Sequence, residues 1–149
     1  MWCILRNKIS TGDNLMKWYF FGPRWCHFCN KDGESSSHIF LNYHVVRNLW
    51  NLVTAAVLTN CNWQLSSLVD AWNLWFSFVL PHKLRNLPLL FCWAVWIACN
   101  QRIFQNSPPK WTIIAALIKA DYDLIPNDPP FTRTQIISQA IIDPNRPWA

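Results

Sequence analysis

Four residues between positions 26 and 44 have the types and spacing of a structural zinc site. Two residues separate Cys26 from Cys29, eight separate Cys29 from His38, and five separate His38 from His44. A C-x2-C pair on a tight loop brings two thiolates within reach of one ion, and a histidine at the start of a helix can close the site. Cysteines and histidines also lie close together by chance, and on spacing alone the two interpretations are about even.

The fourth ligand position decides what kind of site this stretch can form. Tyr43 is a poor zinc ligand at neutral pH because a phenol titrates near pH ~10. His44 is chemically suitable but points about 100° further round a helix than residue 43, so it can ligate only if the helix begins late or unwinds locally. Otherwise the ion has three protein ligands and a water, as in catalytic sites. The accompanying carboxylate is then Glu34, on a loop expected to be mobile.

Other catalytic patterns are missing from the sequence. It has no G-x-S-x-G, no P-loop, no H-E-x-x-H and no glycine-rich dinucleotide turn, and its three glycines could hardly supply one. The eight acidic residues are dispersed, and His27 and His82 are interpreted as ordinary loop residues. We therefore predict that the chain is not an enzyme.

The composition favours a domain that packs against a partner. The 149 residues include eleven Trp, and only 14% are charged, against about 25% in an average protein. Because so much indole is hard to hide in a monomer, part of the surface is expected to contact another domain or protein. The net charge of +5 suits RNA or DNA. However, the basic residues are scattered, and a slightly basic solvated surface explains them about as well.

The cysteines and the apolar segments bear on the location of the protein. No secretory signal peptide is visible, so the six cysteines are expected to be reduced and the protein intracellular, in the nucleus or the cytoplasm. The most apolar stretch, residues 87–98, has only a dozen residues, whereas about 20 are needed to cross a bilayer. No membrane association is expected.

Helical signals dominate the chain, and the sequence predicts an all-α fold with a small zinc-knuckle-like Cys/His loop. Thr11 is expected to cap a short helix over 12–18, which ends at Gly22-Pro23 before the loop 24–37. Four longer helices are predicted: 38–57, with apolar residues near a 3.6 spacing; 68–79, capped by Ser66 or Ser67 and stopped by Pro81; 88–104, beginning at Pro88; and 111–125, after the break at Ser107-Pro108-Pro109. A linker over 126–130, a weaker helix over 133–142 and an unstructured tail follow.

A longer ordered pattern surrounds the Cys/His stretch. A T-x-D-N-L helix leads to C-x-x-C, an acidic loop, a histidine segment and a Trp, carried here by Thr11, Asp13, Asn14, Leu15, Cys26, Cys29, Glu34, His38, Ile39, Phe40 and Trp50. Further on, Trp93, Trp96, Asn100, Ile103 and Phe104 fit a W-x-x-W-x-x-R-N-x-x-I-F helix, with Cys99 where Arg is usual. This pattern resembles the zinc-binding domain that follows the polymerase in plant non-LTR (LINE-type) retrotransposon reverse transcriptases.

The resemblance implies that Zn²⁺ is the cofactor and that Cys26, Cys29 and His38 are ligands. The family's fourth ligand is a cysteine, whose place is taken by Tyr43, so His44 is the one neighbour predicted to replace it. Residues 1–60 would be the zinc-binding domain, 61–125 a helical extension, and 126–149 a linker with a weakly ordered tail. The polymerase and ribonuclease H acids are not in the chain, which is therefore expected to be an isolated fragment.

The function implied by the resemblance is structural. The domain would bind zinc and support the positioning of RNA or DNA, or of neighbouring domains, without catalysis. One alternative is a Trp-rich helical module that docks a protein partner after its metal site has decayed. Another is a retroelement remnant with no function.

Overall fold

The computed structural model describes residues 2–19, 21–56, 67–78 and 80–127. In this part of the chain the regular structure is helical, and the one pairing of extended backbone is an antiparallel bridge between Trp25 and Gly33. The predicted all-α class with a small Cys/His loop is confirmed. The predicted helix over 133–142 and the tail lie outside the described residues.

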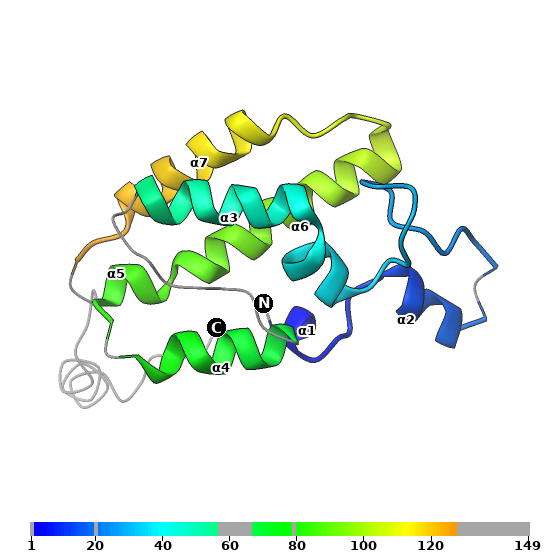
Figure 1. Ribbon diagram of the computed structural model, residues 1–149, viewed down its shortest axis with the longest axis horizontal. Coiled ribbons are helices and arrows are strands. Elements are labelled where there is room, and N and C mark those ends of the chain that lie inside the picture. Colours follow the sequence, from blue (N-terminus) through cyan, green and yellow to red (C-terminus); the bar gives the residue numbers. More distant parts are fainter. Residues whose placement is uncertain (1, 20, 57–66, 79, 128–149) are drawn as a thin grey trace, which may run out of the picture.

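The helices of the described part lie side by side in an elongated bundle (Figure 1). α6 packs on α7, α3 packs on α7, and the π-helical turn η1 contacts both α3 and α6. The Cys/His loop and α2 lie together at one end of the bundle. The bounds are α1 Trp2–Leu5, α2 Gly12–Lys17, η1 His38–Asn42, α3 His44–Ala56, α4 Leu68–Ser77, α5 His82–Arg85, α6 Leu87–Gln105 and α7 Trp111–Leu124. The sequence did not predict α1 and α5, each of which is a single turn.

Several helix ends follow from local sequence chemistry. Ser67, one of the two predicted caps, has extended backbone before α4, and its Oγ accepts a hydrogen bond from the backbone N–H of Asp70 at 3.1 Å. Pro88 lies in the first turn of α6. That helix ends at Asn106, whose left-handed φ of 50° stops it just before the predicted break at Ser107. Asn tolerates this conformation better than most residues.

The predicted helix over 38–57 is wrong at one point. The chain first forms η1, then breaks at Tyr43, whose φ of −63° and ψ of 115° are extended, and restarts as α3 at His44. The N–H of Tyr43 donates to the carbonyl of His38 at 2.8 Å and closes the wide turn. This turn buries residues 39–41 consecutively, which one face of a straight α-helix cannot do.

The core is built around Trp50 of α3. Its ring meets those of Trp75 of α4 and Phe91 of α6 edge-on, with centroids 5.3 and 4.9 Å apart, a favourable arrangement for aromatic pairs. The same cluster of buried residues includes Ile4 of α1 and Ile118 of α7. Both predicted regions, 1–60 and 61–125, therefore contribute to one hydrophobic core. Their boundary lies outside the described residues and stays a prediction.

The structure divides the tryptophans between the core and the surface. Trp50 and Trp75 are each 2% exposed, whereas Trp18, Trp25 and Trp93 are 61%, 52% and 59% exposed. Part of the Trp excess therefore lies in the core, and contact of the exposed Trp residues with a partner stays a prediction. Trp50 and Trp75 stabilise the bundle itself.

One continuous segment of the described chain is long and apolar enough, by length and composition, to cross a membrane. It runs from His82 to Gln105 and contains an 18-residue window of mean hydropathy 1.3. Polar residues interrupt its apolar run, so a count of consecutive apolar residues underestimates this length. Phe91, Val95 and Cys99 of this segment are buried against the other helices, as the residues of a core helix are. The absence of membrane association stays a prediction.

Candidate metal centre

The two cysteines lie on a tight turn at the tip of a short hairpin. The N–H of Asn30 donates to the carbonyl of Cys26 at 2.8 Å, and Asn30 adopts a left-handed φ of 55° that asparagine tolerates. The hairpin arms are joined by hydrogen bonds from the N–H of Cys26 to the carbonyl of Asp32 at 2.7 Å and from the N–H of Glu34 to the carbonyl of Arg24 at 2.9 Å. We call residues 24–34 the knuckle.

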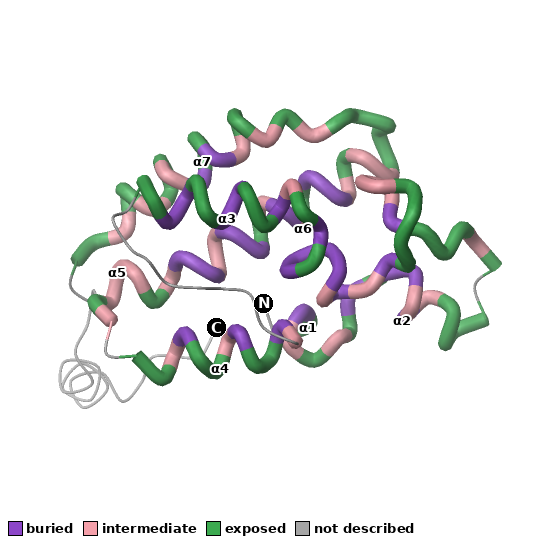
Figure 2. Tube along the Cα trace, in the orientation of Figure 1, coloured by how far each residue is buried: buried purple, intermediate pink, exposed green. Residues whose placement is uncertain are grey.

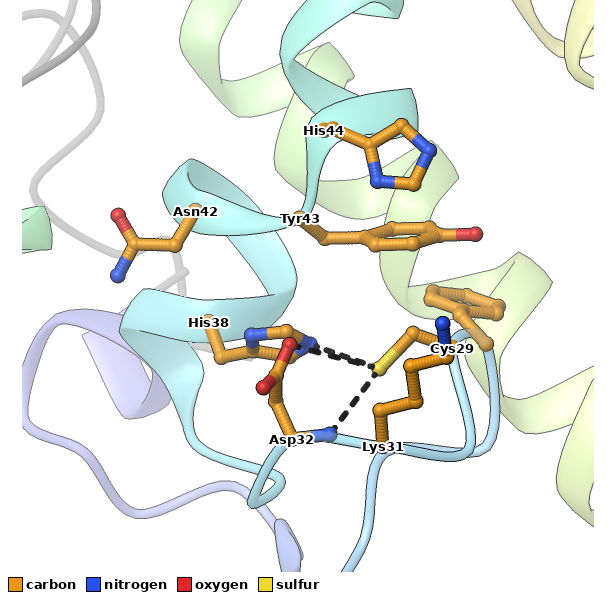
Figure 3. Close-up of a pocket in the computed structure, with 8 residues that line it drawn as sticks. Cys29, Lys31, Asp32, His38, Asn42, Tyr43 and His44 are labelled. Carbon is orange, nitrogen blue, oxygen red and sulfur yellow. Dashed lines mark hydrogen bonds between the residues drawn. The ribbon is translucent and has the colours of Figure 1, made fainter.

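The start of η1 brings a histidine to the knuckle. The Oγ of Ser35 accepts a hydrogen bond from the N–H of His38 at 3.1 Å, which fixes the first turn. The imidazole Nε2 of His38 then lies 3.5 Å from the Sγ of Cys29 (Figure 3). The ligand atoms of Cys26, Cys29 and His38 all lie within 4.8 Å of one another. The structure thus brings together three of the four predicted ligands.

Backbone N–H groups point at both sulfur atoms. The Sγ of Cys26 accepts from the N–H of Phe28 at 3.4 Å, and the Sγ of Cys29 accepts from the N–H of Asp32 at 3.5 Å. Such bonds favour the thiolate form, which is the form that binds a metal. These N–H groups lie where they would stabilise the negative charge of a metal-bound sulfur.

Burial affects which of the ligand side chains carry a proton in the metal-free protein. It raises the pKa of Cys26 to about 11, an effect that the hydrogen bonds to its sulfur only partly offset. A zinc ion must therefore displace a proton from this thiol, and its binding is expected to tighten as the pH rises. Burial also lowers the pKa of His38, so the imidazole is neutral at pH 7 and able to ligate.

Tyr43 lines a cleft beside Cys29 and His38, but its phenol oxygen is not directed at them (Figure 3). The cleft has a volume of about 400 Å³ and is bounded by Cys29, Asp32 and His38 among other residues. The phenol oxygen of Tyr43 points away from Cys29 and His38 (Figure 3). Burial raises the pKa of this phenol, and the neighbouring thiolates raise it further, so it stays protonated at neutral pH. Tyr43 is unsuited to be a zinc ligand, as the sequence predicted.

His44 lies beyond the ring of Tyr43. α3 does begin late, at His44, which is the condition that the sequence set for ligation. The Tyr43 ring nevertheless stands between the His44 imidazole and the pair Cys29 and His38 (Figure 3). The ring centroids of Tyr43 and His44 are 5.1 Å apart and meet edge-on. The structure does not place His44 within the cluster of three ligands.

Glu34 was expected on a mobile loop, but its side chain is buried and both of its carboxylate oxygens have partners. Its side chain is 4% exposed. One carboxylate oxygen accepts from the N–H of Gly12 at 3.1 Å, and the other lies 3.1 Å from Nδ1 of His27. The carboxylate thus joins the knuckle to the first residue of α2. On the opposite side, Nε of Arg102 in α6 donates to the carbonyl of His27 at 3.4 Å. Sequence spacing gave no signal for either contact.

The T-x-D-N part of the pattern is also explained by hydrogen bonds. The side-chain amide of Asn14 is buried and donates to the carbonyls of Asn7 and Ile9 at 2.7 and 2.9 Å. Thr11 is fully buried, and its hydroxyl donates to the carboxylate of Asp13. These bonds fasten α2 to the segment that precedes it.

A family model described as zinc-binding in reverse transcriptase matches residues 1–50. This part of the chain is a reverse-transcriptase zinc-binding domain. The chain has no match among curated proteins or solved structures. The matched residues include the knuckle and η1, and two sulfur atoms with one imidazole nitrogen are a donor set that suits zinc. The fourth ligand of this zinc-binding domain is not shown by the match, and the plant non-LTR origin stays a prediction.

Proposed function

We propose that the zinc-binding domain is a non-catalytic module that positions single-stranded nucleic acid for a reverse transcriptase. Cys26, Cys29 and His38 would hold the zinc ion, which when bound cross-links the knuckle to η1. The lack of any catalytic residue pattern in the sequence supports the non-catalytic part of the proposal. The part that concerns nucleic acid rests on one surface feature near α2.

That feature is a basic cleft with exposed aromatic side chains at its edge. The cleft has a volume of about 170 Å³ and is lined by Arg6, Asn7, Lys8, Asn14, Lys17 and Trp18. Trp18, which lines the cleft, and Tyr19 and Phe21, which follow it in sequence, are 61%, 84% and 97% exposed, in a region that is largely exposed (Figure 2). Proteins that bind single strands combine basic grooves for the phosphates with aromatic rings on which bases stack.

The shape of the basic cleft depends on the knuckle. Asn14 holds α2 against the chain that carries Asn7, and both residues line the cleft. The N-terminal end of α2 is in turn bonded to Glu34 of the knuckle through the N–H of Gly12. A metal that fixes the knuckle would therefore also fix the orientation of α2 and of its basic side chains.

The test is binding of a fluorescent single-stranded RNA to the full chain over a range of salt concentrations. The double variant Lys8→Ala/Lys17→Ala should bind more weakly, and its salt dependence should fall by about one unit of slope for each phosphate that a lysine no longer neutralises. Lys110→Ala is the matched control, since Lys110 is also exposed but lies at the start of α7. If the wild-type chain does not bind at low salt, or if the control weakens binding as much, the proposal fails.

The link to the metal is tested in the same assay. Cys26→Ser should remove zinc and weaken RNA binding, because the knuckle no longer holds α2 in place. Cys3→Ser should change neither zinc content nor affinity, since Cys3 is exposed and outside the ligand cluster. Unchanged RNA binding by zinc-free Cys26→Ser would separate nucleic-acid binding from the metal.

One observation favours a second candidate, docking of a protein partner on α7. Ile113, Leu117 and Leu124 follow one another at spacings of four and seven residues and so share one helix face. They are 51%, 58% and 82% exposed. A chain that does not bind RNA but forms a complex sensitive to Leu117→Lys would support this candidate.

A further inference from the structure

We propose that the carboxylate of Asp32 is the fourth zinc ligand in this chain. The ligand set would then be two cysteines, one histidine and one aspartate, in place of the third cysteine that the family resemblance implies. This inference rests on the proposed zinc site at Cys26, Cys29 and His38.

Asp32 lies next to Cys29 of the three clustered ligands, just outside the group of ligand atoms that lie within 4.8 Å of one another. Its Oδ2 is 3.9 Å from the Sγ of Cys29, and its backbone N–H donates to the same sulfur at 3.5 Å. Figure 3 shows the carboxylate facing the Cys29 sulfur. The same side chain lines the cleft that Cys29 and His38 line. Among the described residues at this cleft, Asp32 is the one carboxylate.

The competing donors are placed less favourably. The oxygen of Tyr43 points away from Cys29 and His38, and the ring of His44 lies behind the Tyr43 ring. Glu34 is turned from the cleft and is engaged with Gly12 and His27. Asp32 is exposed, so its carboxylate can turn towards a cation without breaking a buried contact.

The charge of the resulting site supports the assignment. Carboxylate oxygen is an established zinc ligand, at about 2.0–2.2 Å. Two thiolates and one carboxylate around Zn²⁺, with a neutral imidazole, give the site the same net charge as three thiolates and one imidazole. A site completed by a neutral histidine or by water would carry one negative charge less. Asp32 therefore replaces the missing cysteine in charge as well as in number of ligands.

The main experiment measures zinc affinity of the full chain by competition with a chromophoric chelator. Asp32→Asn keeps the backbone N–H that donates to Cys29 and removes only the anionic oxygen. It should weaken zinc binding by more than about tenfold, since loss even of outer-shell partners commonly costs 10–100-fold. His44→Ala, and Asp121→Asn on the exposed face of α7, should stay within about twofold, because distant surface charges interact weakly.

A second readout distinguishes a ligand from a nearby charge. With Co²⁺ in place of zinc, the visible absorption bands report the ligands bound to the metal. Asp32→Asn should change these bands, whereas Asp121→Asn should not. If Asp32→Asn lowers affinity but leaves the bands unaltered, the carboxylate only attracts the cation and the inference is overturned.

The remaining outcomes are also decisive. The assignment is overturned if Asp32→Asn binds zinc as tightly as the wild type. It is also overturned if His44→Ala binds zinc about tenfold or more weakly than the wild type. In both cases the three-residue zinc site would still stand. Absence of zinc binding by the wild-type chain would instead refute the proposed zinc site itself. Circular dichroism of each variant shows whether the helices are retained.

Discussion

The ring of Tyr43 joins the knuckle to two other parts of the molecule. It stacks on Phe28 at a centroid distance of 5.7 Å and lies 6.3 Å from Trp111, the first residue of α7. Phe28 and Trp111 themselves meet edge-on at 5.2 Å. A cysteine at position 43 would donate a ligand but could not fill this space. Where the resemblance implies a cysteine ligand, Tyr43 therefore supplies aromatic packing.

This role predicts opposite outcomes for two substitutions of Tyr43. Tyr43→Ala should lower the free energy of unfolding by about 3 kcal/mol, because it removes a large buried ring. Tyr43→Phe should change it by less than about 0.5 kcal/mol, since the hydroxyl faces away from the cluster and the ring is kept. Urea unfolding at saturating zinc measures both. Equal destabilisation of the two variants would show that the hydroxyl, not the ring, is what matters.

The predicted ligands differ in how far local sequence determines their position. Cys26 and Cys29 share one tight turn, so a spacing of two residues is enough to bring them together. The orientation of His44 depends on where η1 ends, which no spacing rule reports. Sequence reasoning missed Asp32 because the zinc pattern holds only cysteine and histidine donors, and because the position of Asp32 depends on the hairpin that pairs it with Cys26.

At the scale of elements, Glu34 connects the knuckle with α2. Its carboxylate accepts the N–H of Gly12, and its backbone carbonyl accepts the N–H of Asp13 at 3.1 Å. The two segments are 22 residues apart in sequence, so hydrophobic periodicity cannot reveal the contact. The position of Glu34 in the acidic loop of the family pattern was the one available signal, and it did not indicate burial.

We predict that Glu34→Ala weakens the contact between the knuckle and α2. The substitution leaves the N–H of Gly12 buried without its acceptor, at a cost of about 2 kcal/mol in the free energy of unfolding. Zinc affinity should fall as well, because the knuckle is no longer supported by α2. Glu34→Gln keeps a hydrogen-bond acceptor for the N–H of Gly12, so its free energy of unfolding should fall clearly less than that of Glu34→Ala. Thermal melts and zinc titrations of both variants provide the measurement, and a wild-type melting temperature for Glu34→Ala would contradict the prediction.

The break between η1 and α3 shows the limit of periodicity arguments. The apolar spacing that predicted this helix included Leu49 and Val53, which are buried, but also Leu52, which is 54% exposed. Ile39, Phe40 and Leu41 are apolar as well, so the pattern did not show that the turn widens before Tyr43. The sequence therefore predicted that this segment is helical, but it did not predict the wider π-helical turn at residues 38–42.

At the scale of the whole molecule, the zinc-binding domain shares its core with the helices that follow it. Trp50 belongs to the matched residues 1–50, while its ring partners Trp75 and Phe91 come from α4 and α6. The sequence predicted the helices but not which of them would pack together. Such pairings depend on side-chain shape across the core rather than on local propensity. The metal site therefore lies at the end of a bundle that has its own hydrophobic core.

This arrangement predicts that zinc removal unfolds one end of the molecule first. In the knuckle, Cys26 and Glu34 are buried, whereas Trp25 is exposed and His27, Phe28 and Cys29 are only partly buried. The knuckle therefore has fewer buried apolar contacts than α6, and a bound ion would contribute a larger share of its stability. α6 is held instead by buried Leu87, Phe91, Val95 and Cys99. Free zinc at 100 times its dissociation constant would contribute about 2.7 kcal/mol to stability, and a chelator should lower the melting temperature accordingly.

Hydrogen exchange locates the effect. After chelation, amides of residues 24–37 should lose protection, while those of α6 keep theirs, because local opening of the knuckle leaves the core intact. Cys26→Ser should show the chelated pattern from the outset and should not respond to chelator. If α6 loses protection together with the knuckle, the metal and the core form one cooperative unit. An unchanged exchange pattern in the wild type would mean that zinc does not stabilise the knuckle.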